Sequence, residues 1–222
     1  MLILAIDTAL EAKIGNYLRR IQSRKHHGWP LFHGGGFDMS ATVKAYFALK
    51  MIGDDPESEH MRLARTAIQA HPGAAARSNV FTRVMLALYG FLPWRSVPVM
   101  PVEIMLLPKW FPFHLDKISY WARTVIVPLL VLQALKPRAR NPLGIGIEEL
   151  FLQPPQSVGP PHKAPHQKWS WFLFFRAVDA VLRAAEPLFP KRLRKRAIDK
   201  AVRFVTERLN GEDGLGAIFP AM

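Results

Sequence analysis

Apolar residues recur along this chain at the three-to-four-residue spacing of α-helices, and no stretch alternates apolar and polar residues as a half-buried strand does. Glycine and proline turns interrupt the pattern and divide the chain into candidate helices. We expect helices ending near residue 22 and spanning about 38–51, 57–70, 78–89, 115–135, 168–185 and 190–209. Helix pairs joined by such turns predict an all-α fold of stacked αα-hairpins.

One local motif occurs near the N-terminus and again, in degenerate form, near the C-terminus. Residues 17–22 (YLRRIQ) run into the turn His27-Gly28-Trp29-Pro30, and residues 204–209 (FVTERL) run into 210–216 (NGEDGLG) without the glutamine or tryptophan. We expect the Gln22 amide to bond the loop backbone while Trp29 covers it, with glycines supplying positive φ angles. Such a unit fixes the last turn of a helix to the loop that follows.

Longer stretches, together with this motif, resemble the bacterial squalene–hopene cyclases, a triterpene cyclase family. These stretches are 37–53 (FDMSATVKAYFALKMIG), 79–83 (NVFTR), 97–104 (VPVMPVEI), 119–123 (SYWAR) and 216–220 (GAIFP). The resemblance implies (α/α) barrel-type helical repeats, the smaller barrel domain of the cyclase, and an N-terminal-half segment of a polypeptide roughly three times longer. We therefore expect residues 1–222 to form a single all-α domain, a fragment of a longer cyclase, with an irregular proline-rich surface loop at 137–167.

Composition excludes several kinds of site. The chain has no cysteine, which rules out disulfides, thiolate metal sites and thiol nucleophiles and fits a reducing compartment. The first six residues are apolar but lack a basic region and a cleavage site, so we predict no signal peptide. Residues 125–132 (VIVPLLVL) are too few to span a bilayer and contain Pro128, which predicts a buried, kinked helix.

The formal net charge of +13 predicts an anionic partner, either nucleic acid or a phospholipid surface. No helix-turn-helix, zinc or RNP-type motif supports nucleic acid. In residues 168–186 the polar side chains share one helical stripe, aromatic and aliphatic residues fill the rest, and five bases follow within 191–196. This combination is typical of an interfacial membrane anchor, with candidate residues Trp169, Trp171, Phe172, Phe175, Lys191, Arg192, Arg194, Lys195 and Arg196.

The alternative interpretation of this region is a wide core-facing helix followed by a solvated run of charge. The family resemblance favours the membrane, because members of the family are monotopic and take their substrate from the bilayer. It implies a peripheral location on the cytoplasmic side of the cell membrane and an anionic membrane surface as a partner.

The resemblance also implies the chemistry, the cyclisation of squalene to hopene and hopanol through a carbocation cascade. A hydrocarbon substrate requires a strong acid, a dry cavity and aromatic faces that stabilise migrating positive charge. Matching cavity positions are Trp121, Phe81, Ile218, Phe219 and Pro220, with Phe219 standing where some members carry Gln. Without the resemblance, ordinary core packing is the alternative role for each.

The family's proton donor is the middle aspartate of an Asp-x-Asp-Asp motif, which this sequence does not contain. Its adjacent carboxylates, at 54–55, 148–149 and 212–213, fall in hydrophilic turns or at helix edges where a protonated state is unfavourable. Lys44 and Asn79 also stand where some members of the family have Glu and Arg. We therefore assign no catalytic residue and expect the chain alone to be inactive unless a complementing C-terminal cyclase polypeptide supplies the acid.

The alternative function is a non-catalytic, membrane-associated helical module that binds lipid. His26, His27 and His33 lack carboxylate or cysteine partners at ligand spacing, so we predict neither a metal site nor a cofactor.

Overall fold

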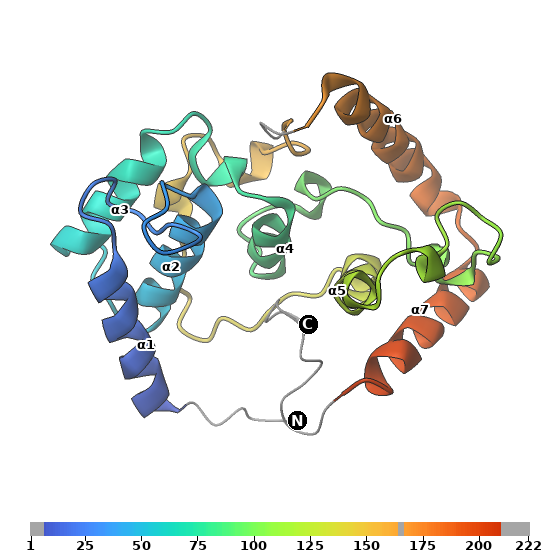
Figure 1. Ribbon diagram of the computed structural model, residues 1–222, viewed down its shortest axis with the longest axis horizontal. Helices are drawn as coiled ribbons and strands as arrows, with labels where there is room; N and C mark the ends of the chain where they lie inside the picture. The colour runs from blue at the N-terminus through green and yellow to red at the C-terminus, as the bar shows by residue number, and fades with distance from the viewer. Residues whose placement is uncertain (1–6, 164–166, 210–222) are drawn as a thin grey trace. The chain divides into compact units, whose positions relative to one another are not determined.

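The computed structural model describes residues 7–163 and 167–209, and within these ranges the chain is helical and contains no β-strand (Figure 1). The all-α prediction is therefore confirmed. The α-helices are α1 (Thr8–Ile21), α2 (Met39–Met51), α3 (Glu59–Gln69), α4 (Val80–Leu88), α5 (Tyr120–Leu135), α6 (Trp169–Ala185) and α7 (Lys191–Thr206). Their ends agree with the expected ranges to within a few residues, except that the helix expected at 115–135 begins as a separate 3-10 turn, η4 (Leu115–Lys117).

The chain folds as two compact units, which are described separately here. Unit 1 comprises Met1–Ser96 and Ala139–Pro161, and unit 2 comprises Val97–Arg138 and His162–Met222. The main chain therefore leaves unit 1 after Ser96 and returns to it at Ala139 before entering unit 2 again. Each unit has its own cluster of buried apolar side chains.

The glutamine–tryptophan motif at the end of α1 makes the contacts that the sequence predicts. The Gln22 amide donates to the carbonyl oxygens of His27 (2.7 Å) and His60 (2.9 Å). The Trp29 indole N–H donates to the carbonyl of Leu18 at 2.9 Å, and the Trp29 side chain is buried. His27 has a φ of 57°, the left-handed region in which glycine is ordinarily favoured. The motif thus fixes the end of α1 to the following loop and to the start of α3.

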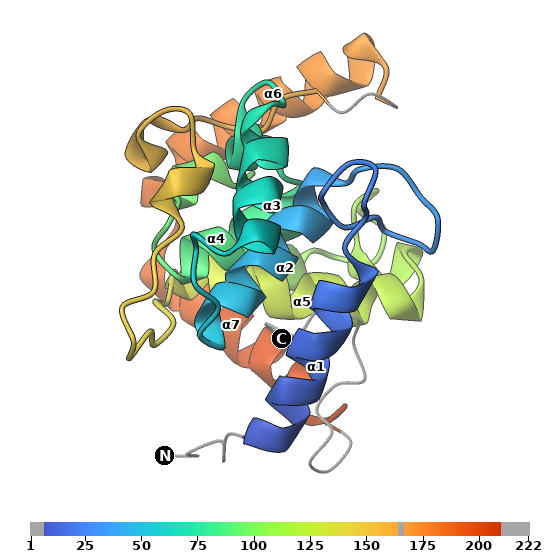
Figure 2. The ribbon, with the colours of Figure 1, turned by 90° about the vertical axis from the view of Figure 1, so that its left-hand side faces the viewer.

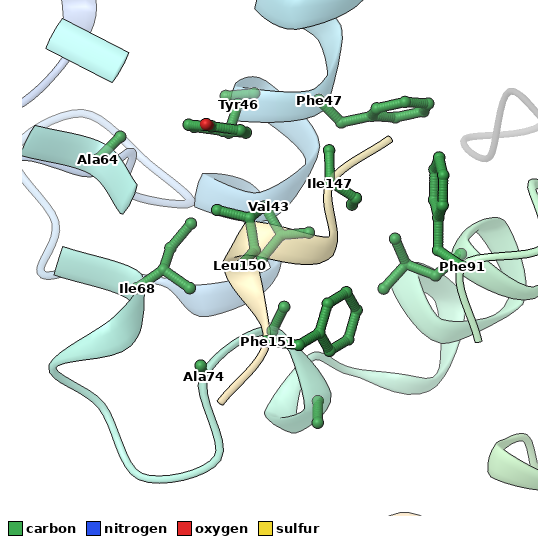
Figure 3. Close-up of a cluster of buried hydrophobic side chains, with 14 of the residues drawn as sticks. Val43, Tyr46, Phe47, Ala64, Ile68, Ala74, Phe91, Ile147, Leu150 and Phe151 are labelled. Atoms are coloured by element: carbon green, nitrogen blue, oxygen red, sulfur yellow. The ribbon is translucent and has the colours of Figure 1, made fainter. Parts of the chain in front are cut away.

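The core of unit 1 lies between α2, α3 and the segment 139–161 (Figure 3). Helix α2 is buried on several sides, including Val43, Tyr46 and Leu49, because α1 and α3 both pack against it (Figure 2). Asp38 begins α2 by accepting a hydrogen bond from the backbone N–H of Ala41 at 2.7 Å. Asp38 is therefore the N-cap of this helix.

The segment expected to be a proline-rich surface loop differs from that expectation. It is irregular, with short 3-10 turns such as η5 (Glu148–Leu150), but it is not confined to the surface. Four of its side chains belong to the core of unit 1. They are Val158 and the three that Figure 3 labels, Ile147, Leu150 and Phe151. Proline clusters indicate irregular backbone, whereas burial is decided by the apolar residues between them, and the sequence interpretation gave those residues too little weight.

The segment is also held by polar contacts, all within unit 1. Glu149 accepts hydrogen bonds from the Tyr46 hydroxyl (2.9 Å) and from Lys50 Nζ (2.5 Å), and Gln69 donates to its main-chain carbonyl at 2.7 Å. Burial and the Glu149 carboxylate raise the pKa of the Tyr46 phenol, so that hydroxyl remains the donor. Residues 139–161 are therefore an integral part of unit 1.

Unit 2 is built around α5 and α7. The side chains of Val127, Leu130, Ala197 and Ala201 meet in a core that includes residues of η3 (Val102–Leu106). Pro128 lies inside α5 and is buried, in agreement with the buried helix predicted there. Within the described ranges no helix combines the length and hydropathy that crossing a bilayer requires.

Candidate functional site

Helix α6 turns its aromatic face to solvent. None of its residues is buried, and the exposed large apolar side chains include Trp169, Trp171, Phe174 and Phe175. Phe172, also predicted to contact the membrane, is half-buried, and its ring packs against Trp169 with centroids 5.8 Å apart. The rings also contact one another, because Trp171 stacks on Phe175 at a centroid distance of 6.0 Å. The helix therefore carries two groups of contacting rings, one of Trp169 with Phe172 and the other of Trp171 with Phe174 and Phe175. Exposed apolar surface of this kind marks an interaction site.

The C-terminal part of the polar stripe of α6 faces the body of unit 2 instead, whereas Arg176 is exposed. Asp179 accepts a hydrogen bond from the backbone N–H of Val99 at 2.7 Å and forms an ion pair with Arg183 at 3.0 Å. Arg183 also donates to the carbonyl of Val97, at 3.3 Å. Just beyond the helix, Glu186 pairs with Lys136 at 2.9 Å. The amphipathic helix is thus turned with its polar side inward, the reverse of the core-facing alternative.

The basic run that follows α6 forms the first turns of α7. Four of its predicted membrane-contacting bases are exposed: Lys191, Arg192, Lys195 and Arg196. The fifth, Arg194, instead forms an ion pair with Glu103 at 2.9 Å and lies over the Phe189 ring. Buried Ala197 and Ala201 bring the opposite face of α7 against the core of unit 2. The exposed bases therefore project from a helix whose other side is anchored.

The two described cavity candidates occupy equivalent places in their helices. Phe81 is the second residue of α4 and Trp121 the second residue of α5, after the capping residues Asn79 and Ser119. They are 42% and 54% exposed, so neither is a core residue of its unit. Phe81 belongs to unit 1 and Trp121 to unit 2. Ile218, Phe219 and Pro220 lie outside the described residues.

Arg83, two residues after Phe81 in α4, is a buried residue with several hydrogen-bond partners, and the sequence alone did not single it out. Its side chain is 1% exposed, and its guanidinium donates to the carbonyls of Ser96 (2.7 Å), Gly159 (3.0 Å), Ser78 (3.3 Å) and Ala76. Burial lowers its pKa to about 10, which leaves it charged at neutral pH. The sequence did contain a signal, because Arg83 is the single charged residue of α4, whose other residues are apolar except Thr82.

Among the paired carboxylates of unit 1, Asp54 is held in its ionised form. The Arg19 guanidinium donates to both Asp54 oxygens, and His60 Nε2 lies 2.6 Å from one of them. The hydrogen bonds from Arg19 lower the pKa of the Asp54 carboxyl, which is the opposite of what a proton donor to an alkene needs. Glu149 is engaged by Lys50 and Tyr46, and residues 212–213 lie outside the described residues.

The histidines near the first turn do not gather into a site. His26 packs edge-on against Phe37 and accepts a hydrogen bond from the Gly28 backbone N–H at 3.3 Å, while His33 is exposed. In residues 7–163 and 167–209, no three His, Cys, Asp or Glu side chains lie together as a metal ion would require.

Comparison with known proteins assigns the chain to a family. The family model for the squalene–hopene cyclase N-terminal domain matches residues 1–222. The chain is 67% identical to a squalene–hopene cyclase of Bradyrhizobium diazoefficiens over 98% of its own length and 33% of that protein. It is 59% identical to the enzyme of Zymomonas mobilis (97% of the chain, 32% of that protein) and 34% identical to that of Alicyclobacillus acidocaldarius (97% and 33%).

These matches cover nearly all of the chain but only about a third of each relative. The printed sequence therefore corresponds to an N-terminal segment of those proteins. The high identity to the Bradyrhizobium enzyme and the match of the family model along the whole sequence agree with each other. The chain belongs to the squalene–hopene cyclase family.

Proposed function

We propose that this chain supplies the N-terminal segment of an enzyme that cyclises squalene to hopene and hopanol. The observation that carries the proposal is the 67% identity to a squalene–hopene cyclase over 98% of the chain. In the proposed reaction an acid protonates a terminal alkene of squalene, and successive alkenes attack the resulting cation to form rings. Loss of a proton from the last cation gives hopene, and addition of water gives hopanol.

In this reaction the chain contributes surfaces that stabilise charge. We assign Trp121 and Phe81 to the cavity wall, where their ring faces would attract the migrating cation. Their exposure of 54% and 42% supports the assignment, because a ring buried in the core of its own unit could not contact substrate. Arg83 acts as a positioning residue, since it ties the helix that carries Phe81 to the carbonyls of Ser96 and Gly159.

We further propose that the 222-residue chain has no cyclase activity by itself, because it contains no Asp-x-Asp-Asp motif. The test combines the purified chain with a polypeptide that comprises the remaining two-thirds of the Bradyrhizobium cyclase. We expect hopene from squalene only in the mixture, with neither polypeptide active alone. Conversion by the chain alone would refute its inactivity. A mixture in which the two polypeptides bind each other but form no hopene would refute the cyclase role.

The same protein is proposed to bind the cytoplasmic side of the cell membrane as a peripheral protein, through α6 and the start of α7. The aromatic face of α6 supports this, because aromatic side chains partition into the interface while neighbouring bases attract anionic headgroups. The test is co-sedimentation with anionic vesicles. We expect Trp171→Ser with Phe175→Ser to reduce binding at least tenfold. Phe32→Ser, which alters an even more exposed aromatic residue of unit 1, should leave binding unchanged.

The inward-facing polar stripe of α6 also favours a second candidate, a lipid-binding helical module without chemistry. The two candidates predict the same vesicle binding and differ in the complementation test. Vesicle binding that depends on α6, together with a mixture that binds but never forms hopene, would favour the module.

A further inference from the structure

Helix α1 presents two different faces. One face packs into unit 1, where Gly15 is buried against the Ile52 side chain and Leu18 packs on the core cluster. A separate row of apolar side chains points away from this contact: Leu10, Ile14, Tyr17 and Ile21, which are 52%, 48%, 52% and 38% exposed. We call these four residues the α1 seam. The seam runs along nearly the full length of the helix, which Figure 2 shows beside α2.

The spacing of the seam is that of a coiled coil. Its members follow one another at intervals of four, three and four residues, which corresponds to alternating a and d positions of a heptad repeat. At 3.6 residues per turn they fall within about 60° of arc, much narrower than the face a helix needs to lie in a bilayer. The seam also lacks tryptophan and phenylalanine, unlike α6. A second helix fits this surface better than a membrane does.

The residues beside the seam restrict which helix fits. Lys13 and Arg20 occupy the two positions along one edge, whereas Glu11 and the core-facing Leu18 lie along the other. Two copies of α1 packed antiparallel would bring the basic edges together, and a parallel pair would place Lys13 opposite Leu18. Neither arrangement pairs the charges favourably. The basic edge instead complements acidic side chains on the partner.

We propose that the α1 seam docks an amphipathic helix with an apolar a/d stripe flanked by acidic residues, supplied by the part of the cyclase that this chain does not span. The chemistry of the partner is inferred from α1 alone, and its source rests on the proposed function. Each relative is about three times as long as the matched region, so most of its residues lie outside the comparison.

The first experiment uses the 222-residue chain and two labelled 21-residue peptides with leucine at a and d. The acidic probe has glutamate at e and g, and the basic probe has lysine there. By fluorescence anisotropy we expect the acidic probe to bind at least tenfold more tightly than the basic one. A scrambled peptide of the acidic composition controls for general attraction to a chain of net charge +13.

Substitutions in α1 test whether the acidic probe binds at the α1 seam. Ile14→Ser with Tyr17→Ser should weaken the acidic probe at least tenfold, although the charge is unchanged. Leu173→Ser with Val181→Ser, which alters exposed apolar residues of α6, should not. Lys13→Glu with Arg20→Glu should reverse the preference between the two probes. Helix content by circular dichroism establishes that each variant is folded.

The second experiment identifies the source of the helix, again by binding and without measuring cyclisation. We expect the remaining two-thirds of the Bradyrhizobium cyclase to bind the chain and to lose affinity at least tenfold when the seam is changed. Equal binding of both probes, or binding that the seam variant leaves intact, would overturn the proposal. A dimer of the chain that depends on the seam would also overturn the proposal, because a second copy would then occupy the seam. Vesicle binding that depends on the seam would overturn it as well, because a membrane would then be the occupant.

Discussion

At the level of single residues, the strongest constraint in unit 1 is a buried charge without an acidic partner. Arg83 is paired with backbone carbonyls instead of a carboxylate, and these four carbonyls come from three separate parts of the chain. A guanidinium suits this task because its five N–H donors point in fixed directions, which a lysine ammonium cannot reproduce. The cost of burying the charge is offset by hydrogen bonds that the carbonyls would otherwise lack.

Replacing Arg83 should therefore destabilise the fold strongly. We expect Arg83→Met to lower the free energy of unfolding by at least about 3 kcal/mol, because several buried carbonyls lose their donor. The free energy of unfolding of Arg83→Lys should lie between that of Arg83→Met and that of the wild type. Urea unfolding measures both. The control is Arg24→Met at an exposed position, expected within about 0.5 kcal/mol of wild type. If Arg83→Met lowers the free energy of unfolding no more than Arg24→Met does, the hydrogen bonds of Arg83 do not stabilise the fold.

Asp54 should make stability depend on pH in the acid range. The hydrogen bonds from Arg19 lower the folded-state pKa of Asp54 below its unfolded value of about 3.9. A lowered pKa stabilises the fold above the unfolded value, and that contribution is lost as pH falls from about 4 through the folded-state pKa. We expect Asp54→Asn to lower Tm at pH 7 and to make Tm less sensitive to pH between 5 and 3.

The neighbouring substitution Asp55→Asn provides the comparison for this pH series. Asp55 accepts a hydrogen bond from the backbone N–H of Glu57 at 2.9 Å. Asparagine keeps an oxygen acceptor at that position, so the variant removes a neighbouring carboxylate charge without removing this local hydrogen bond. If both variants show the same pH profile as the wild type, the Arg19–Asp54 pair does not contribute to acid stability.

At the level of elements, helices and hydrogen bonds between nearby residues can be predicted from local sequence patterns. Contacts between residues far apart in the chain cannot be predicted in this way. The Gln22–Trp29 unit was predictable because its donors and acceptors lie within a few residues of one another, and the structure contains those bonds. Helix ranges followed from periodicity and turns for the same reason. The contact of Glu149 with Lys50 and Tyr46 joins residues about a hundred positions apart, and no local pattern indicates it.

The candidate site shows the same division. The exposed bases of α7 followed from sequence, but the engagement of Arg194 by Glu103 depends on an element 91 residues earlier in the chain. For α6, the polar stripe was predicted correctly as a stripe, whereas periodicity could not tell which side faces the protein. Only the contacts of Asp179 and Arg183 with residues 97 and 99 show that the stripe faces inward.

The segment 139–161 yields a prediction with a matched control two residues away. Leu150 is 0% exposed in the core of unit 1, and Leu152 is 58% exposed. We expect Leu150→Ala to lower the free energy of unfolding by about 2–5 kcal/mol, because it removes buried methyl groups and leaves a cavity. Leu152→Ala should change it by less than about 0.5 kcal/mol. Similar urea midpoints for the two variants would mean that the segment is a surface loop after all.

At the level of the whole molecule, charge and exposed apolar surface act together. The chain carries a formal net charge of +13, and part of this charge lies on the exposed side of α7, directly after the aromatic face of α6. The charge attracts any anionic surface over a distance set by ionic strength, whereas aromatic insertion acts only on contact. A nucleic acid would attract the charge of the chain but offers no apolar layer into which the aromatic side chains of α6 could insert.

Salt should therefore separate the two contributions to vesicle binding. Raising the salt concentration from 0.15 to 1 M shortens the screening length from about 8 to 3 Å and should weaken binding to anionic vesicles. Binding to neutral vesicles should respond little to salt and should be lost in Trp171→Ser with Phe175→Ser. Lys195→Glu with Arg196→Glu should show the converse, weakening anionic binding and sparing neutral binding. If the aromatic variant binds neutral vesicles as wild type does, α6 does not enter the membrane and the attachment is electrostatic alone.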